Sequence, residues 1–140
     1  MSLLVPIFLL AITIVGLVSS IRSLFVAKVS RKQYFSLENI VFLILIYITV
    51  LLGFGIIFTV LDVNNAPVLI ENGMPIKGDF ITKLESAMYF SAITLLSVGY
   101  GDITPVGIGR WVAIVEALIG YTIPMAFVVK SVIQAERNEN

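Results

Sequence analysis

Three long apolar stretches, separated by polar segments, dominate the pattern of hydrophobic positions along the chain. They cover residues 3–21, 40–60 and 105–133, and each can cross a bilayer, because a crossing needs roughly 20 apolar residues. A further helical segment at residues 81–96 is too short to cross. The pattern therefore predicts an all-α membrane protein with three crossing helices and a shorter helix before the third.

The polar segments between these stretches predict the topology. Four basic residues precede the second stretch without an acid among them, namely Arg22, Lys28, Arg31 and Lys32. Basic loops favour the cytoplasmic side, so residues 62–80 are expected to form an outer loop. Within this loop, residues 72–75 (Asn-Gly-Met-Pro) are typical of a turn. A short hairpin and an irregular loop fit this sequence equally well.

The first apolar stretch has two interpretations, a retained membrane helix or a cleavable signal peptide. No lysine or arginine precedes it and no A-x-A-like cleavage site follows it, although a signal peptide usually has both. We expect it to be retained, which places the amino terminus outside.

The overall composition agrees with a membrane protein. Hydrophobic residues make up 59% of the chain and charged residues 13%, with a mean hydropathy of +1.04. The net charge of zero gives no sign of a nucleic-acid partner, which would show as a basic excess. The chain has no cysteine and no histidine, so disulfides and the usual transition-metal ligands are excluded. We expect no enzyme, because no nucleophile stands beside a plausible base.

The segment Ser97-Val98-Gly99-Tyr100-Gly101-Asp102 follows the short helix. Backbone carbonyls that all point at one axis can replace the water around a dehydrated cation. Carbonyls alternate in an ordinary strand, so this alignment needs positive φ at some positions, which glycine adopts at little cost. Gly99 and Gly101 stand at suitable positions, and Val98 and Tyr100 are expected to turn their side chains into protein. The alternative is a glycine-rich turn with no ion role.

Residues 91–105 resemble the filter region of pore-loop potassium channels, especially small prokaryotic ones with two membrane helices. The resemblance implies a pore domain at residues 36–134, built from an outer helix, a pore helix with its filter loop, and an inner helix. An additional N-terminal transmembrane helix at residues 1–28 would precede it, and a short cytoplasmic tail at 135–140 would follow. One chain supplies one filter strand, so the resemblance also implies a homotetramer that crosses the cell membrane several times. Its partners would be its own copies and the lipid bilayer.

The function that this resemblance implies is passive, selective conduction of potassium. The permeant K+ would be bound by five consecutive residues: Ser97, Val98, Gly99, Tyr100 and Gly101. The family usually has threonine at the position of Ser97, and serine lacks the methyl group that stiffens χ1. We therefore expect a less rigid innermost ion site. The alternatives are a weakly selective cation channel and a non-conducting membrane regulatory subunit that keeps the pore fold only for assembly.

Around the filter, the resemblance suggests that Tyr89 bonds Asp102 and braces the outer mouth. Tyr89 and its neighbour Phe90 could equally be packing residues, because aromatic side chains dominate buried contacts. Ile93 stands where some relatives carry a glutamate behind the filter, so that carboxylate is missing here.

The third apolar stretch contains three residues that are unusual in a membrane helix. The resemblance places Gly120 at a gating hinge, and Pro124 predicts a kink because it removes a helix hydrogen bond. Both could instead be tolerated helix breakers. Glu116 is costly inside a span, and we expect it to be functional, to be neutral, or to bond a hydroxyl of Ser91, Thr94 or Ser97.

Three apolar residues recur at helical spacing beyond Gly120, namely Met125, Val128 and Val132. They could form an apolar constriction that gates the pore. Residues that simply face lipid or another helix would show the same pattern.

Overall fold

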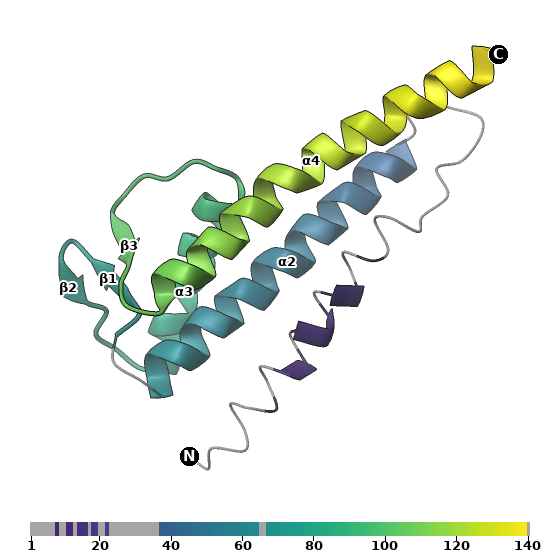
Figure 1. Cartoon of the computed structure of the whole chain (residues 1–140). Coiled ribbons are helices and arrows are strands. Elements are labelled where there is room, and N and C mark those ends of the chain that lie inside the picture. The colour runs from purple at the N-terminus through teal and green to yellow at the C-terminus, as the bar shows by residue number, and fades with distance from the viewer. Residues whose placement is uncertain are drawn as a thin grey trace.

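The computed structural model describes residues 37–64 and 67–139, together with residues 8, 11, 12, 14–16, 18, 19 and 22. Most of the predicted N-terminal helix at 1–28 therefore lies outside the described residues. Over residues 37–64 and 67–139 the order of elements is α2, β1, β2, α3, β3 and α4 (Figure 1).

Two long helices, α2 (Leu37–Asn64) and α4 (Gly109–Glu139), lie side by side along most of their length (Figure 1). Ile40–Asn64 of α2 and Gly109–Val129 of α4 are long and apolar enough to cross a membrane. The second and third predicted crossing helices are thus confirmed in their length and composition. Helix α4 continues through Pro124 as a single helix, and its ribbon is continuous in Figure 1.

The shorter helix α3 (Phe80–Leu95) matches the helix predicted at 81–96. Its first turn is capped by Asp79, whose Oδ1 accepts a 3.0 Å hydrogen bond from the Thr82 amide. This bond stabilises the ionised carboxylate and lowers the pKa of Asp79. The helix packs against both α2 and α4 and ends where the Ser97–Asp102 segment begins.

A small antiparallel sheet at the same end of the molecule has the strand order β2-β1-β3. Strand β1 (Leu69–Glu71) pairs with β2 (Met74–Pro75) and also with β3 (Ile103–Pro105). Asn72 and Gly73 form the turn between β1 and β2, with φ of 49° and 82°, as a two-residue type I′ hairpin requires. Residues 69–75 of the loop predicted at 62–80 therefore form a hairpin rather than an irregular loop. The start of that predicted loop belongs to α2, which continues to Asn64 instead of ending at residue 60.

Strand β3 corrects two expectations from the sequence. Pro105 does not open the third helix, because it is the last residue of β3 and pairs with Leu69, whereas α4 begins at Gly109. The predicted all-α class is also incomplete, since the fold is mostly helical but includes this sheet. The sheet connects the outer loop to the residues that directly follow Asp102.

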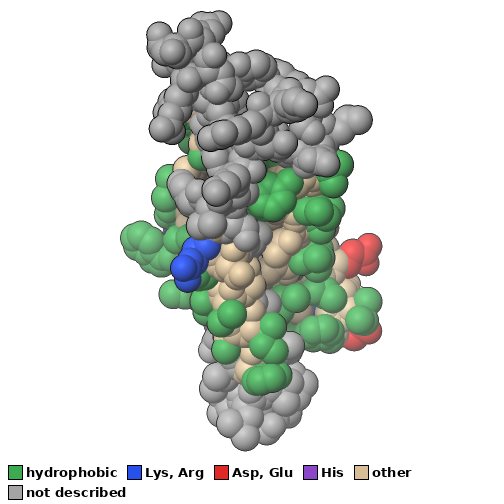
Figure 2. All heavy atoms as spheres, turned by 90° about the vertical axis from the view of Figure 1, so that its right-hand side faces the viewer, with side chains coloured by type: hydrophobic (Ala, Val, Ile, Leu, Met, Phe, Trp, Pro, Cys, Tyr) green, Lys and Arg blue, Asp and Glu red, His purple; other side chains and the backbone are tan. Residues whose placement is uncertain are grey.

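The core lies where α2, α3, α4 and the sheet meet. The rings of Phe58 and Phe90 pack edge to face there, with centroids 5.1 Å apart, and Leu95 is also buried. Outside this core, many large apolar side chains of α2 and α4 are exposed, and hydrophobic side chains dominate the described surface in Figure 2. Such a surface suits contact with lipid or with other copies of the chain.

Candidate functional site

The Ser97–Asp102 segment, called the filter loop below, is bonded to the carboxyl end of α3. The Ser97 amide donates to the Thr94 carbonyl at 3.0 Å, and the Val98 amide donates to the Ile93 carbonyl at 2.8 Å. With Leu96 as the C-cap, these two bonds form a Schellman motif, in which the residue after the cap is left-handed. That residue is Ser97, with φ of 57°.

Left-handed backbone recurs at every second residue of the filter loop. Ser97, Gly99 and Gly101 have φ of 57°, 58° and 81°, which confirms the positive φ predicted for the two glycines. When left-handed residues alternate with right-handed or extended ones, successive carbonyls turn toward the same side of the strand. A cation-binding strand needs its carbonyls arranged in this way. The sequence did not show the conformation of Ser97, because only glycine marks such a position reliably.

The side chains between these left-handed residues are not covered by the chain's own fold. Val98 is 48% exposed and Tyr100 is 73% exposed, so a single chain does not provide the protein surroundings that the sequence led us to expect. Both apolar side chains remain available for contact with another molecule.

The carboxyl end of the filter loop is held by two hydrogen bonds to Asp102. Its carboxylate accepts from the Tyr89 hydroxyl at 2.7 Å, and its carbonyl accepts from the Asn72 amide at 3.0 Å. The bond from Tyr89 lowers the pKa of the Asp102 carboxyl group and raises the pKa of the Tyr89 hydroxyl. The predicted Tyr89–Asp102 bond is thus present. Phe90 instead packs against Phe58.

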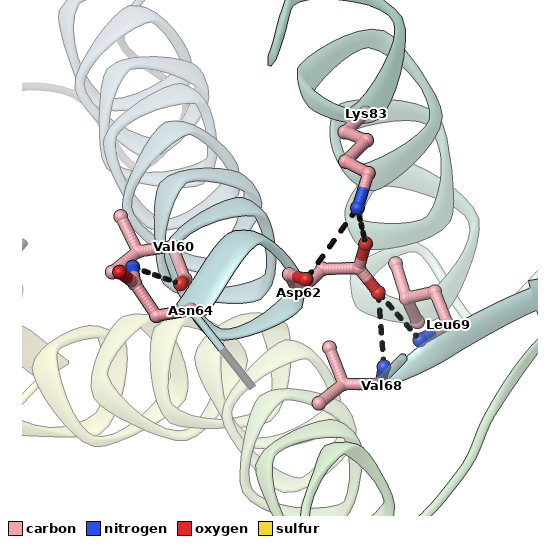
Figure 3. A network of polar contacts seen from close by, with 6 residues as sticks. All are labelled: Val60, Asp62, Asn64, Val68, Leu69 and Lys83. Atoms are coloured by element: carbon pink, nitrogen blue, oxygen red, sulfur yellow. Dashed lines mark hydrogen bonds and ion pairs between the residues drawn. The ribbon is translucent and has the colours of Figure 1, made fainter. Parts of the chain in front are cut away.

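A second polar network anchors the sheet whose strand β3 follows Asp102 (Figure 3). Asp62, near the end of α2, forms a 2.7 Å ion pair with Lys83 of α3. Its other oxygen accepts from the amides of Val68 and Leu69, at 2.9 and 3.5 Å. Asp62 therefore ties β1 to both helices, and β1 in turn pairs with β3 behind Asp102.

Glu116 lies at a junction of all three helices. Its side chain is completely buried, at 0% exposure, and its Oε1 accepts a hydrogen bond from the Ser91 hydroxyl of α3. The Ser91 hydroxyl also lies 3.1 Å from the Leu51 carbonyl of α2. Of the three hydroxyl partners considered for Glu116, the structure selects Ser91. Glu116 Oε2 has no hydrogen-bond partner within the described part of the chain.

Gly120, one turn after Glu116, makes the next contact between the helices. The Tyr47 hydroxyl of α2 donates to the Gly120 carbonyl at 2.9 Å. A Cβ at position 120 would collide with the backbone carbonyl of Leu95, so α4 and the end of α3 touch at this glycine. Sequence reasoning missed Tyr47, because a tyrosine in an apolar helix carries no signal of its partner.

The predicted apolar constriction beyond Gly120 remains a prediction. Met125 and Val128 are 49% and 57% exposed in the single chain. The side chain of Val132 lies outside the part that the structure describes.

The geometry defines an architecture in which a short helix and a loop lie between two helices of membrane-crossing length. Residues 45–137 match a family model described as "Ion channel". The chain is 44% identical over 121 residues to "Protein LctB" of Geobacillus stearothermophilus, covering 86% of this chain and 90% of the relative. It is 42% identical over 123 residues to "Protein LctB" of Bacillus caldotenax, covering 88% and 92%. No solved structure matches the chain.

These matches cover most of the chain and include α3, the filter loop and most of both long helices. The protein belongs to the ion channel family. Family membership supports ion-channel activity and a location in a membrane, in agreement with the two apolar helices.

Proposed function

We propose that this protein is a subunit of a potassium-selective channel, in which the backbone carbonyls of Ser97 to Gly101 bind K+ in single file. The observation that carries the proposal is the left-handed backbone at Ser97, Gly99 and Gly101. It supports a strand whose carbonyls face one axis and can replace the hydration shell of the ion. The channel conducts passively, so K+ is the permeant ion and no covalent chemistry takes place.

Helix α3 supports the same function through its electrostatics. Its carboxyl end leads directly into the filter loop, and a helix carries partial negative charge at this end. Several such helices aimed at one axis favour a cation between them. The carboxylate of Asp102 at the outer end adds further negative charge near the ion path.

One chain supplies only one wall of such a pore, so the proposal includes a cyclic homotetramer. The exposed side chains of Val98 and Tyr100 support this arrangement, because a neighbouring copy would cover them. The tetramer lies in the cell membrane with several crossings per chain. The filter loop faces outward and the basic segment around residues 22–32 faces the cytoplasm.

A weakly selective cation channel is the second candidate, and the backbone of Ser97 favours it. A left-handed residue other than glycine is strained by roughly 1–2 kcal/mol. Ser97 is such a residue, and release of its strain would change the backbone geometry of the innermost ion site. A relaxed site would discriminate less between K+ and Na+.

The test is the flux of K+ and Na+ through the purified protein in liposomes, with barium as blocker, for the wild type, Gly99→Ala and Gly107→Ala. Both glycines have positive φ, at 58° and 52°, and a Cβ at either meets nothing within 4 Å. The two substitutions therefore introduce the same kind of backbone strain, one inside the filter loop and one outside it.

We expect barium-sensitive flux that is selective for K+ and is lost only in Gly99→Ala. Equal K+ and Na+ flux would replace the proposal with the weakly selective channel. A wild type that passes neither ion would point to a non-conducting regulatory subunit. Equal loss in both variants would show that general backbone strain, rather than the filter loop, had been tested.

A further inference from the structure

Pro124 leaves one carbonyl of α4 without its usual donor. Proline has no amide hydrogen, so it cannot donate to the carbonyl four residues earlier, which is that of Gly120. The Tyr47 hydroxyl of α2 donates to this same carbonyl at 2.9 Å. A hydrogen bond from the neighbouring helix therefore takes the place of the one that Pro124 removes, and α4 continues through this position.

The same glycine also contacts the base of the filter loop. A side chain at position 120 would meet the carbonyl carbon of Leu95 at 2.9 Å and its Cα at 3.0 Å. Leu95 is the last residue of α3 and lies two residues before Ser97. The residue of α4 whose carbonyl lacks a backbone donor thus touches the end of α3, the helix that leads into the filter loop.

Contacts one helical turn from Gly120 also hold α2, α3 and α4 together. Each of the three helices contributes two residues spaced by four positions, so the contacts form two successive layers. The upper layer contains Leu51, Ser91 and Glu116, and the lower layer contains Tyr47, Leu95 and Gly120. The three helices are fixed at two adjacent levels, and Tyr47 provides the hydrogen bond of the lower level.

We propose that Tyr47 is a positioning residue for conduction. Its hydroxyl holds α4 in the unbroken form at the Pro124 position and so keeps Gly120 seated against Leu95 below the filter loop. When the bond opens, the Gly120 carbonyl is free, α4 can bend at Pro124, and its contact with the base of the filter loop changes. Breaking and making this bond shifts the open probability of the pore. The proposal rests on the proposed ion conduction.

A double-mutant cycle tests the link between Tyr47 and Pro124. Tyr47→Phe removes only the hydroxyl, whereas Pro124→Ala restores an amide that can donate to the Gly120 carbonyl. We expect Tyr47→Phe to change open probability about five-fold in the wild type, as for the loss of one hydrogen bond. In the Pro124→Ala background the change should fall below about two-fold, because the helix then supplies its own donor. Thr49→Val is the control, since Thr49 lies on α2, is exposed, and bonds through its hydroxyl to the Leu45 carbonyl of the same helix.

The measurements are single-channel recordings in K+ and thermal unfolding in detergent for all four members of the cycle. The expected result is a change in open probability at constant unitary conductance, with non-additive effects in both measurements. Equal effects of Tyr47→Phe in the two backgrounds would overturn the link to Pro124. Non-additive unfolding with an unchanged open probability would overturn the positioning role and leave a purely structural bond.

Failure of the proposed function is a separate result. A wild type that conducts no ion would overturn ion conduction and, with it, the role of Tyr47 in conduction. A conducting wild type whose open probability is indifferent to Tyr47 would overturn this proposal alone. The unfolding cycle needs no conduction and decides the Tyr47–Pro124 link in either case.

Discussion

The Tyr89 hydroxyl donates a 2.7 Å hydrogen bond to the Asp102 carboxylate and thereby joins the middle of α3 to the residue that ends the filter loop. The bond favours the ionised carboxylate, which lowers the pKa of Asp102. An ionised phenol would face that carboxylate, so the pKa of Tyr89 is raised. The carboxyl end of the filter loop is therefore held by an interaction that depends on pH.

Tyr89→Phe removes this donor and is expected to return the pKa of Asp102 toward its ordinary value of about 3.9. A carboxyl group whose pKa is lower in the folded than in the unfolded protein stabilises the fold when the pH is above the unfolded-state pKa. This stabilisation is lost as the pH falls through the folded-state pKa. The wild type should therefore melt at a higher temperature than Tyr89→Phe near neutral pH. This difference in melting temperature should shrink in acid below about pH 3.9. Melting curves across this range check it, with Tyr121→Phe as control. A difference that stays constant with pH would contradict the assignment.

Ser97→Gly separates backbone strain from ion binding at the inner end of the filter loop. Because Ser97 has φ of 57°, glycine should relieve strain and stabilise the protein by about 1 kcal/mol. The same change removes the hydroxyl, so the ratio of K+ to Na+ flux should fall. Ser97→Ala is the control, since it removes the hydroxyl but keeps the strain. Stabilisation by both variants would show that the strain is not the cause.

Glu116 is expected to act through its hydrogen bond and its volume rather than through its charge. In Glu116→Gln the amide can still bond the Ser91 hydroxyl, so the cost should stay below about 1 kcal/mol. Glu116→Ala leaves a cavity and removes the bond at a fully buried position, at a cost of about 2–4 kcal/mol. Thermal unfolding of both variants compares these values. Equal damage in the two variants would mean that the carboxylate itself is required.

Gly120→Ala and Gly55→Ala test two contacts of different rigidity. A Cβ at position 120 would collide with the backbone of Leu95, which cannot move without shifting the end of α3, so we expect a cost of about 1–3 kcal/mol. A Cβ at position 55 would mainly meet the Met88 side chain, which is flexible and can adjust. Alanine also raises helix propensity, so Gly55→Ala should cost much less. Comparable melting temperatures for the two variants would contradict the tight contact at Leu95.

Asp62 is expected to stabilise the fold mainly through the amides of Val68 and Leu69 at the start of β1. Asp62→Ala leaves the Val68 amide without its acceptor and Lys83 without its ion-pair partner, at a cost of about 1–3 kcal/mol. Asp62→Asn keeps an oxygen for Val68 and loses only the charge, and Lys83 is 23% exposed, so its cost should be smaller. Unfolding in detergent ranks the two variants. Equal costs in the two variants would assign the stability to the ion pair.

Features of the site that depend on short segments could be predicted from the sequence. The helix ending at the filter loop follows from its length and position, and the positive φ of Gly99 and Gly101 follows from the freedom of glycine. The Tyr89–Asp102 bond was expected from the family resemblance. The left-handed Ser97 could not be predicted, because it depends on how α3 ends rather than on the residue itself.

The amino-acid order alone predicted a membrane protein with three apolar crossing helices and a pore-type loop, because apolar run length and glycine placement act locally. Two helices of crossing length are present in the described residues. Only the tertiary structure decided that Pro105 ends a strand rather than starting a helix, because that depends on its pairing with Leu69. The bond from Tyr47 to the Gly120 carbonyl joins residues 73 positions apart. Such contacts arise from the way the helices pack, and no local pattern in the chain encodes their register.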